Sequence, residues 1–220
     1  MENQLQELAL AAQKMGWNLS TGQLTQFDLY QQELLRWNAK INLISAKSAR
    51  EIVGRHFQDS LTALHFIEKK DARLIDIGCG AGFPGIPLKI ALPSLKLYLV
   101  EINRKKVSFL KHILRLLNLT DAFVLANRVE ILQQAENWQF FFDIMISRAA
   151  FKLPEMLSYG TYFLVPGGTL IALKGSDIKC EFSPQNATAF PYNYYQLFQY
   201  NTIQSSSGSP RKIIVGKKTK

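Results

Sequence analysis

The sequence predicts an α/β protein built on a doubly wound, mostly parallel sheet. From Arg73 onward, short apolar runs alternate with segments of helical period, and a glycine-rich turn follows the first run. The runs show little polar alternation, which is typical of strands covered on both faces. Alternating strands and helices give parallel pairing with right-handed crossovers. The 220 residues suffice for one such domain with a small addition.

The first part of the chain, residues 1–70, is expected to be a helical N-terminal cap. Apolar side chains recur on one helical face over residues 2–15. Ser20 and Gln23 then have the spacing of a capping box, which predicts the start of a second, longer helix. A third helix is expected over about 48–67.

The remainder, residues 71–220, is interpreted as one compact domain with seven strands. Helix-period segments separate the first five runs, and the last two flank a polar SSSGSP loop, which predicts a closing antiparallel pair. The expected strands are 73–77, 96–101, 122–126, 141–147, 168–174, 192–200 and 211–218.

The composition narrows the class of protein. A net charge of +9 favours a polyanionic partner such as nucleic acid or an acidic membrane surface, the alternative being a merely basic protein. Two cysteines, Cys79 and Cys180, exclude a disulfide framework and predict a reducing compartment. We see no metal-ligand cluster, signal segment or apolar stretch that could cross a bilayer. A cytoplasmic protein without a metal or membrane contact is therefore expected.

The turn LIDIGCGAGFPG (74–85) has two possible registers. Gly80-x-Gly82-x-x-Gly85 matches the dinucleotide fingerprint. That match begins late, however, and Pro84 lies inside it, where a proline removes one of the N–H groups that a pyrophosphate needs. Pro84 or a following proline is also expected in the first turn of the next helix.

The second register, Gly78-x-Gly80-x-Gly82, begins two residues after Asp76. It resembles the first motif of class I methyltransferases, whose cofactor S-adenosylmethionine has no phosphate. Glu101 ends the second strand 19 residues after Gly82, where an acid can hold both ribose hydroxyls. This argues against NADP but does not separate S-adenosylmethionine from NAD. The alternative role for Glu101 is a charge at the N-terminus of the next helix.

Seven stretches together resemble the ribosomal RNA small-subunit methyltransferase G family, also called glucose-inhibited division protein B. They are LLRWNAKINLIS (34–45), RHFQDSL (55–61), DIGCGAGFPGIPL (76–88), RKKVSFL (104–110), NRVE (127–130), ISRA (146–149) and PGGTLIALKG (166–175). They extend from the second helix to the fifth strand in the order of the family, and GAGFPGIPL with SRA is the most specific pair.

The resemblance implies a Rossmann-like fold and methyl transfer from S-adenosylmethionine to N7 of one guanine in small-subunit (16S) ribosomal RNA. It also implies site residues. The family usually has aspartate and serine where this chain has Glu101 and Ile102, and residues 176–220 match only loosely. By matched position, Gly78, Gly80, Gly82 and Phe83 border the cofactor, Glu101 takes the ribose position, Val129 and Glu130 approach the adenine, and Arg148 lies at the cofactor and target site.

The residues fit N7 chemistry. Guanine N7 is a lone-pair acceptor and needs no general base. The fourth strand ends in ISRAA, without the Asn/Asp-Pro-Pro-aromatic motif of amine methyltransferases and without a cysteine nucleophile. Arg148 could donate to guanine O6 or to the methionine carboxylate, or could form a structural ion pair with Asp143 or Glu130. His56 and Asp59 could act as a base, but we favour hydrogen bonds that join their helix to the core.

Basic residues predict contacts with RNA phosphates, and a solvated charged face is the alternative. The partner would be small-subunit ribosomal RNA or the 30S particle, bound by a monomer. Rival interpretations are an NAD-dependent oxidoreductase and a non-catalytic ribosome-assembly factor that keeps the cofactor fold. The candidate RNA contacts are Arg55, Arg104, Lys105, Lys106, Lys111, Arg115, Lys174, and the C-terminal Arg211, Lys212, Lys217, Lys218 and Lys220.

Overall fold

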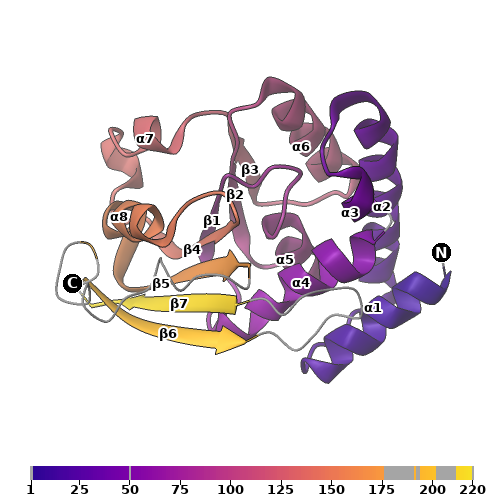
Figure 1. Ribbon diagram of the computed structural model, residues 1–220, viewed down its shortest axis with the longest axis horizontal. Coiled ribbons are helices and arrows are strands. Elements are labelled where there is room, and N and C mark those ends of the chain that lie inside the picture. Colours follow the sequence, from indigo (N-terminus) through magenta and orange to yellow (C-terminus); the bar gives the residue numbers. More distant parts are fainter. Residues whose placement is uncertain (1, 50, 176–190, 192–193, 202–211, 220) are drawn as a thin grey trace.

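The computed structural model describes residues 2–49, 51–175, 191, 194–201 and 212–219. Seven strands form one sheet in the order β3-β2-β1-β4-β5-β7-β6, in which β7 is antiparallel to β5 and β6 and the pairs from β3 to β5 are parallel (Figure 1). The doubly wound, mostly parallel sheet is thereby confirmed. The strands are β1 (Arg73–Ile77), β2 (Lys96–Val100), β3 (Ala122–Leu125), β4 (Phe142–Arg148), β5 (Leu164–Lys174), β6 (Tyr195–Asn201) and β7 (Lys212–Lys218).

Strand β5 begins earlier than the sequence predicts, because it contains a bulge. Leu164 pairs with Phe142, but Thr169 already pairs with Ile144, so the β5 side carries extra residues. A Cβ on Gly168 would lie 2.8 Å from a backbone oxygen, so only glycine fits the bulge. A proline and two glycines inside a strand read as a loop in the sequence, which explains the late predicted start.

The first two helices of the N-terminal part follow the prediction, but the third does not. The Ser20–Gln23 capping box is present at the start of α2. The single helix expected over 48–67 is wrong: the segment is divided among α3, a π-helix, α4 and a 3₁₀ helix. Hydroxyl groups in this segment bond to backbone carbonyls, as when Ser60 Oγ donates to His56 O, and such bonds compete with a regular ladder. The helices are α1 (Glu2–Lys14), α2 (Thr21–Ile41), α3 (Ala46–Ala49), η1 (Val53–Gln58), α4 (Asp59–Leu61), η2 (Thr62–Phe66), α5 (Gly85–Ala91), α6 (Arg104–Leu116), α7 (Val129–Leu132), η3 (Glu136–Trp138) and α8 (Leu153–Phe163).

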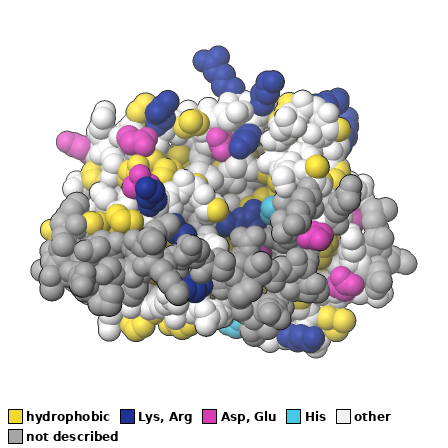
Figure 2. All heavy atoms as spheres, viewed as in Figure 1, with side chains coloured by type: hydrophobic (Ala, Val, Ile, Leu, Met, Phe, Trp, Pro, Cys, Tyr) yellow, Lys and Arg dark blue, Asp and Glu magenta, His cyan; other side chains and the backbone are white. Residues whose placement is uncertain are grey.

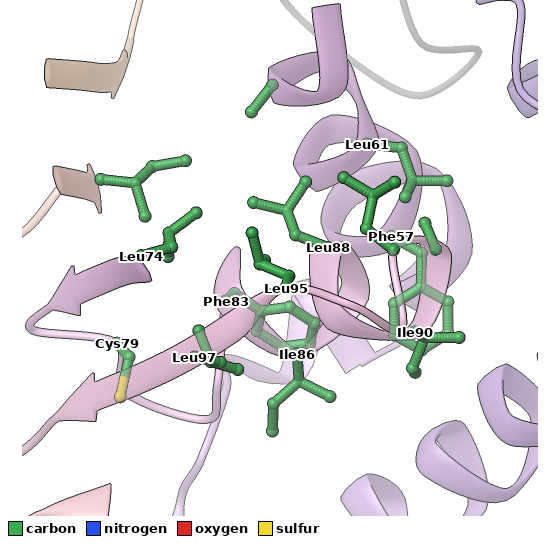
Figure 3. Packing of buried hydrophobic residues seen from close by; sticks show 14 of the residues in the cluster. Phe57, Leu61, Leu74, Cys79, Phe83, Ile86, Leu88, Ile90, Leu95 and Leu97 are labelled. Carbon is green, nitrogen blue, oxygen red and sulfur yellow. The ribbon is translucent and has the colours of Figure 1, made fainter. Parts of the chain in front are cut away.

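The core has two layers, one on each face of the sheet. Leu74 of β1 packs with the N-terminal helices, α5 and α6, whereas the next residue, Ile75, packs with α7 and α8. Figure 3 shows the first layer, where Phe57 of the N-terminal segment and Phe83 lie among leucines and isoleucines of α5 and the strands. The N-terminal helices therefore share a core with the sheet. Within the described residues, we find no helix whose length and apolar character would let it span a membrane.

Candidate active site

The candidate site lies at the carboxyl edge of the parallel strands. Asp76 of β1 is in register with Leu99 of β2 and Ile146 of β4. The residues that follow each strand therefore meet at one edge: the glycine turn after β1, Glu101 after β2 and Arg148 at the end of β4. Ligands of doubly wound folds bind at this edge.

The glycine turn has no room for a side chain at Gly78 and Gly82 but has open space at Gly80. Gly78, Gly80 and Gly82 have φ of +68°, +60° and +97°, where residues with a side chain are strained. A Cβ on Gly78 would lie 2.7 Å from the Ala150 Cβ, and one on Gly82 would lie 2.4 Å from an Ile86 carbon, but one on Gly80 would meet no atom within 4 Å. The turn thus leaves open backbone at Gly80, as a closely approaching ligand requires.

Tyr30 of helix α2 contacts the glycine turn and stabilises it. The buried Tyr30 hydroxyl donates to the Ala81 carbonyl at 2.6 Å, and the Tyr30 ring stacks on Phe83 at 5.4 Å. Gly85, the last glycine of the dinucleotide-like match, serves packing instead, because a Cβ there would lie 2.8 Å from Leu99. This glycine lets α5 pack closely on β2. Sequence reasoning missed Tyr30, because its spacing indicates only the apolar face of a helix.

Glu101 is joined to the glycine turn. Its carboxylate accepts hydrogen bonds from the backbone N–H groups of Gly80 at 3.1 Å, Ile102 at 2.9 Å and Asn103 at 2.8 Å. The N-terminus of α6 is capped by the Asn103 side chain, which accepts from the N–H of Lys105 and the following residue. Asn103, not Glu101, therefore caps α6, and the contact of Glu101 with a ribose remains a prediction.

Arg148 forms the centre of a largely buried polar cluster. One guanidinium nitrogen lies 3.3 Å from an Asp59 carboxylate oxygen, and another lies 2.8 Å from His56 Nδ1. Arginine nitrogens only donate, so Nδ1 of His56 accepts and carries no proton. The guanidinium lies 4.9 Å from the centre of the Phe83 ring, and His56 stacks on the same ring at 4.6 Å. The hydrogen-bonding role expected for His56 and Asp59 agrees with this geometry.

The ion pair offered as the structural alternative for Arg148 was assigned to the wrong partners. Asp143 lies five residues earlier on β4, about 16 Å away along an extended strand, and pairs with Arg73 and Lys69 at the opposite edge. The exposed Glu130 accepts a hydrogen bond from the Tyr159 hydroxyl at 3.0 Å. The sequence could not reveal Asp59 as the partner, because it comes from a separate segment.

The residues matched to the adenine follow β3. Val129 is buried and begins α7, packing in the same layer as Val100. Glu130 stands next to it on the surface. Both therefore lie at the carboxyl edge, and their contact with adenine remains a prediction.

Asp76 is a site residue that sequence reasoning left without a role. One carboxylate oxygen accepts from the Gly85 N–H at 2.8 Å, and the other has no hydrogen-bond partner among the described residues. Burial raises the pKa of Asp76 to about 7. The sequence signal that could have identified Asp76 is an acidic residue near the end of an otherwise apolar, buried strand.

Burial likewise raises the pKa of the Cys79 thiol, so this cysteine is a poor nucleophile.

The predicted RNA contacts fall into four groups. Arg104, Lys105, Lys111 and Arg115 are exposed on α6, whereas Lys106, Lys212 and Lys217 are partly exposed. Lys174 and Lys218 are buried, and each donates to backbone carbonyls, so neither can meet an RNA phosphate at the surface. The side chain of Arg55, together with Arg211, Lys220 and Cys180, lies outside the described residues.

Comparison with known proteins decides the family. The family model described as rRNA small subunit methyltransferase G matches residues 23–208. The chain belongs to this family. A ribosomal RNA small subunit methyltransferase G from Syntrophus aciditrophicus is 46% identical over 202 residues, covering 91% of this chain and 84% of the relative. Another, from Desulfitobacterium hafniense, is 40% identical and covers 78% of this chain and 71% of the relative. The family resemblance is thus confirmed.

Solved methyltransferase structures share the fold. A precorrin-6y C5,15-methyltransferase from Geobacter metallireducens superposes with a TM-score of 0.55 at 15% identity, over 81% of this chain and 92% of that one. An rRNA methylase from Streptococcus thermophilus gives a TM-score of 0.53 at 14% identity, over 76% of this chain and 98% of that one. These neighbours support the class I methyltransferase fold expected from the sequence.

Proposed function

We propose that this protein transfers a methyl group from S-adenosylmethionine to N7 of a guanine in 16S ribosomal RNA. Membership of the methyltransferase G family supports the reaction. The observation that carries it in this chain is the carboxyl edge, where the open backbone of Gly80, the Glu101 carboxylate and the Arg148 guanidinium lie on adjoining strand ends.

The residues at this edge fit S-adenosylmethionine. Glu101 retains acceptor capacity for a ribose hydroxyl at Oε2, which accepts only from Gly80, whereas Oε1 already accepts from Ile102 and Asn103. The buried Asp76 oxygen without a partner suits a cationic group. Val129 and Glu130 would approach the adenine, and Gly78, Gly82 and Phe83 would border the cofactor. When bound, S-adenosylmethionine supplies a methyl group on a positively charged sulfur that leaves readily.

The chain's own residues would then orient the target. Guanine N7 has a lone pair and no proton, so its attack on a methyl carbon requires alignment and the exclusion of water rather than a general base. The Arg148 guanidinium, fixed by Asp59, His56 and the Phe83 ring, is suited to donate to guanine O6 or to a carboxylate. His56 and Asp59 therefore position Arg148 and are not expected to transfer protons.

A cytoplasmic location is part of the proposal, since small-subunit RNA is assembled into the 30S particle in the cytoplasm. Action as a monomer, the state expected from the sequence, is also part of it. An NAD-dependent oxidoreductase is not favoured, since the family and the fold neighbours are methyltransferases. A non-catalytic assembly factor is not favoured either, because the glycine turn, Glu101 and Arg148 are all in place.

The test combines purified protein, S-adenosylmethionine and small-subunit RNA or 30S particles from cells lacking the gene. We expect N7-methylguanine at one position, mapped by chemical cleavage at the modified base. We also expect S-adenosylhomocysteine, but not NAD, to raise the thermal midpoint of the protein. Stabilisation by NAD without methylation would contradict the proposal, and binding of the cofactor without methylation of any of these RNAs would favour the assembly factor.

A further inference from the structure

A second concave site lies between α2 and α6, away from the glycine turn. It is a pocket of about 230 Å³ lined by Glu33, Arg36, Trp37, Lys40, Ile41 and His112. Pockets for drug-sized ligands are larger, roughly 300–1,000 Å³, so this one suits a single flat group.

The interior of the pocket is aromatic and ordered by one carboxylate. The Glu33 carboxylate accepts from Trp37 Nε1 at 3.2 Å and lies 2.8 Å from His112 Nε2 and 3.0 Å from an Arg36 nitrogen. The Trp37 and His112 rings lie 5.3 Å apart, and Phe109 meets Trp37 edge-on from the core side at 5.6 Å. Burial tends to raise the pKa of Glu33, but the hydrogen bonds from His112 and Arg36 outweigh it and lower that pKa. The two rings are therefore held in place.

The rim of the pocket is cationic. Arg36 and Lys40 of α2 are exposed, and the Arg36 side chain is 70% accessible. On α6, Arg104 lies eight residues before His112, on the same face of the helix. Lys111 and Arg115, four residues apart, lie on the neighbouring face. Figure 2 shows Lys and Arg side chains projecting along the upper margin of the molecule, where α6 lies. An aromatic pocket within a cationic rim is the combination that binds single-stranded nucleic acid.

The pocket lies toward the same edge of the sheet as the glycine turn. Gln23 near the start of α2 donates to the carbonyls of Ile90 and Ala91 at the amino edge, whereas Tyr30 reaches the turn at the carboxyl edge. Trp37 follows Tyr30 by seven residues, about 10 Å further along the helix axis. A strand of RNA that presents its target at the turn can therefore extend to this pocket.

We propose that the pocket between α2 and α6 binds one unpaired nucleobase of the RNA substrate, away from the methylated guanine. The base stacks on Trp37 or His112, and the flanking phosphates are held by Arg36, Lys40 and the cations of α6. Because stacking accepts any base and the Glu33 carboxylate is already engaged, the pocket has little sequence preference. The proposal rests on the proposed RNA methyltransferase function.

The direct test is photo-crosslinking with a single-stranded oligouridylate that carries 5-iodouridine, followed by trypsin digestion and mass spectrometry. Trypsin releases Trp37–Lys40 and His112–Arg115 as separate peptides. The expected result is a crosslink in one of these peptides that is lost as salt rises. Crosslinks confined to other peptides, or no crosslink to the bound RNA, would overturn the proposal.

Variants quantify the contact. We expect Trp37→Leu to weaken oligouridylate binding about 10-fold, within the range for loss of one stacked base, and Lys40→Ala to lower the salt dependence of binding. Lys14→Ala removes an exposed lysine from the last turn of α1 and is the matched control, expected to bind normally. If Trp37→Leu does not fold, the crosslink and the Lys40→Ala variant still test the pocket. A Lys40→Ala protein that binds oligouridylate with the same salt dependence as the control would contradict the proposal.

Methylation by the same preparation separates this proposal from the proposed function. If small-subunit RNA is methylated but neither peptide crosslinks, only the base pocket is wrong. If the RNA is neither bound nor methylated, the proposed function fails as well.

Discussion

Buried charged side chains at the two edges of the parallel sheet differ in their hydrogen-bond partners. At the amino edge, each of two buried lysines donates to two backbone carbonyls: Lys89 to the oxygens of Pro93 and Leu95, and Lys218 to those of Thr161 and Leu164. The carboxyl edge also has one such lysine, Lys174, which donates to the Phe151 carbonyl, but in addition it holds Asp76, Glu101 and Arg148. Arg148 is paired with Asp59 from a separate segment, Glu101 accepts from the glycine turn, and one Asp76 oxygen has no hydrogen-bond partner among the described residues.

This difference separates structural charges from functional ones. A buried charge that is fully hydrogen-bonded by its own fold stabilises that fold and has nothing left to offer a ligand. One buried Asp76 oxygen has no hydrogen-bond partner in the part of the chain that the structure describes, and its desolvation cost is relieved by a ligand, a water molecule or a proton. Variants at the two edges can test whether the carboxyl edge is specialised in this way.

The largest effect is expected at Arg148. Lysine retains a positive charge for Asp59 but not the planar fork that also reaches His56, so we expect Arg148→Lys to fold and to methylate about 100-fold more slowly. Single-turnover transfer of a labelled methyl group to small-subunit RNA measures the change. Arg148→Ala removes the cation beside the buried Asp59 carboxylate and should also lose about 3–5 kcal/mol of stability. A normal single-turnover rate in Arg148→Lys would mean that the Arg148 guanidinium does not position the reacting groups.

The glycine turn should separate stability from binding. In Gly82→Ala, the new Cβ meets Ile86 at φ +97°, so we expect a loss of about 3 kcal/mol or more in urea unfolding. Gly80→Ala has only the backbone strain, about 1–2 kcal/mol, because its Cβ points into open space. Calorimetry should nevertheless show weaker S-adenosylmethionine binding by Gly80→Ala. Unchanged affinity would mean that the open side of the turn does not face the cofactor.

Features set by local sequence patterns could be predicted, whereas contacts between distant segments could not. The first strand, the three glycines with positive φ and the capping box at Ser20 could all be predicted, because they depend on local patterns of residue type. The partners of Arg148 could not, because Asp59 and His56 come from an irregular segment whose packing no local period records. The surface cations were predicted by charge alone, which cannot tell the buried Lys174 from the exposed Lys111.

At the amino edge, loss of a buried lysine that donates to backbone carbonyls should affect stability alone. We expect Lys218→Met to lose about 1–3 kcal/mol, because the carbonyls of Thr161 and Leu164 are left without their donor. Methylation per folded molecule should be unchanged. The neighbouring Lys217, paired at the surface with Glu68, is the matched control, and Lys217→Met should cost at most about 1 kcal/mol. A Lys218→Met protein that is fully stable but inactive would reverse the assignment of the two edges.

Asp76 should make the stability of the protein depend on pH. Its pKa is raised from 3.8 to about 7 by burial, so the folded state binds the proton more tightly than the unfolded state. The free energy of unfolding therefore falls as the pH rises from about 4 through about 7, and the loss persists above that pH. Asp76→Asn removes this titration, so its thermal midpoint should gain a few degrees relative to the wild type between pH 5 and pH 8. Because a cationic ligand favours the ionised carboxylate, saturating S-adenosylmethionine should reduce the wild-type fall. A pH-independent difference between the two proteins would mean that Asp76 is ionised throughout, and that its second oxygen has a partner within the fold.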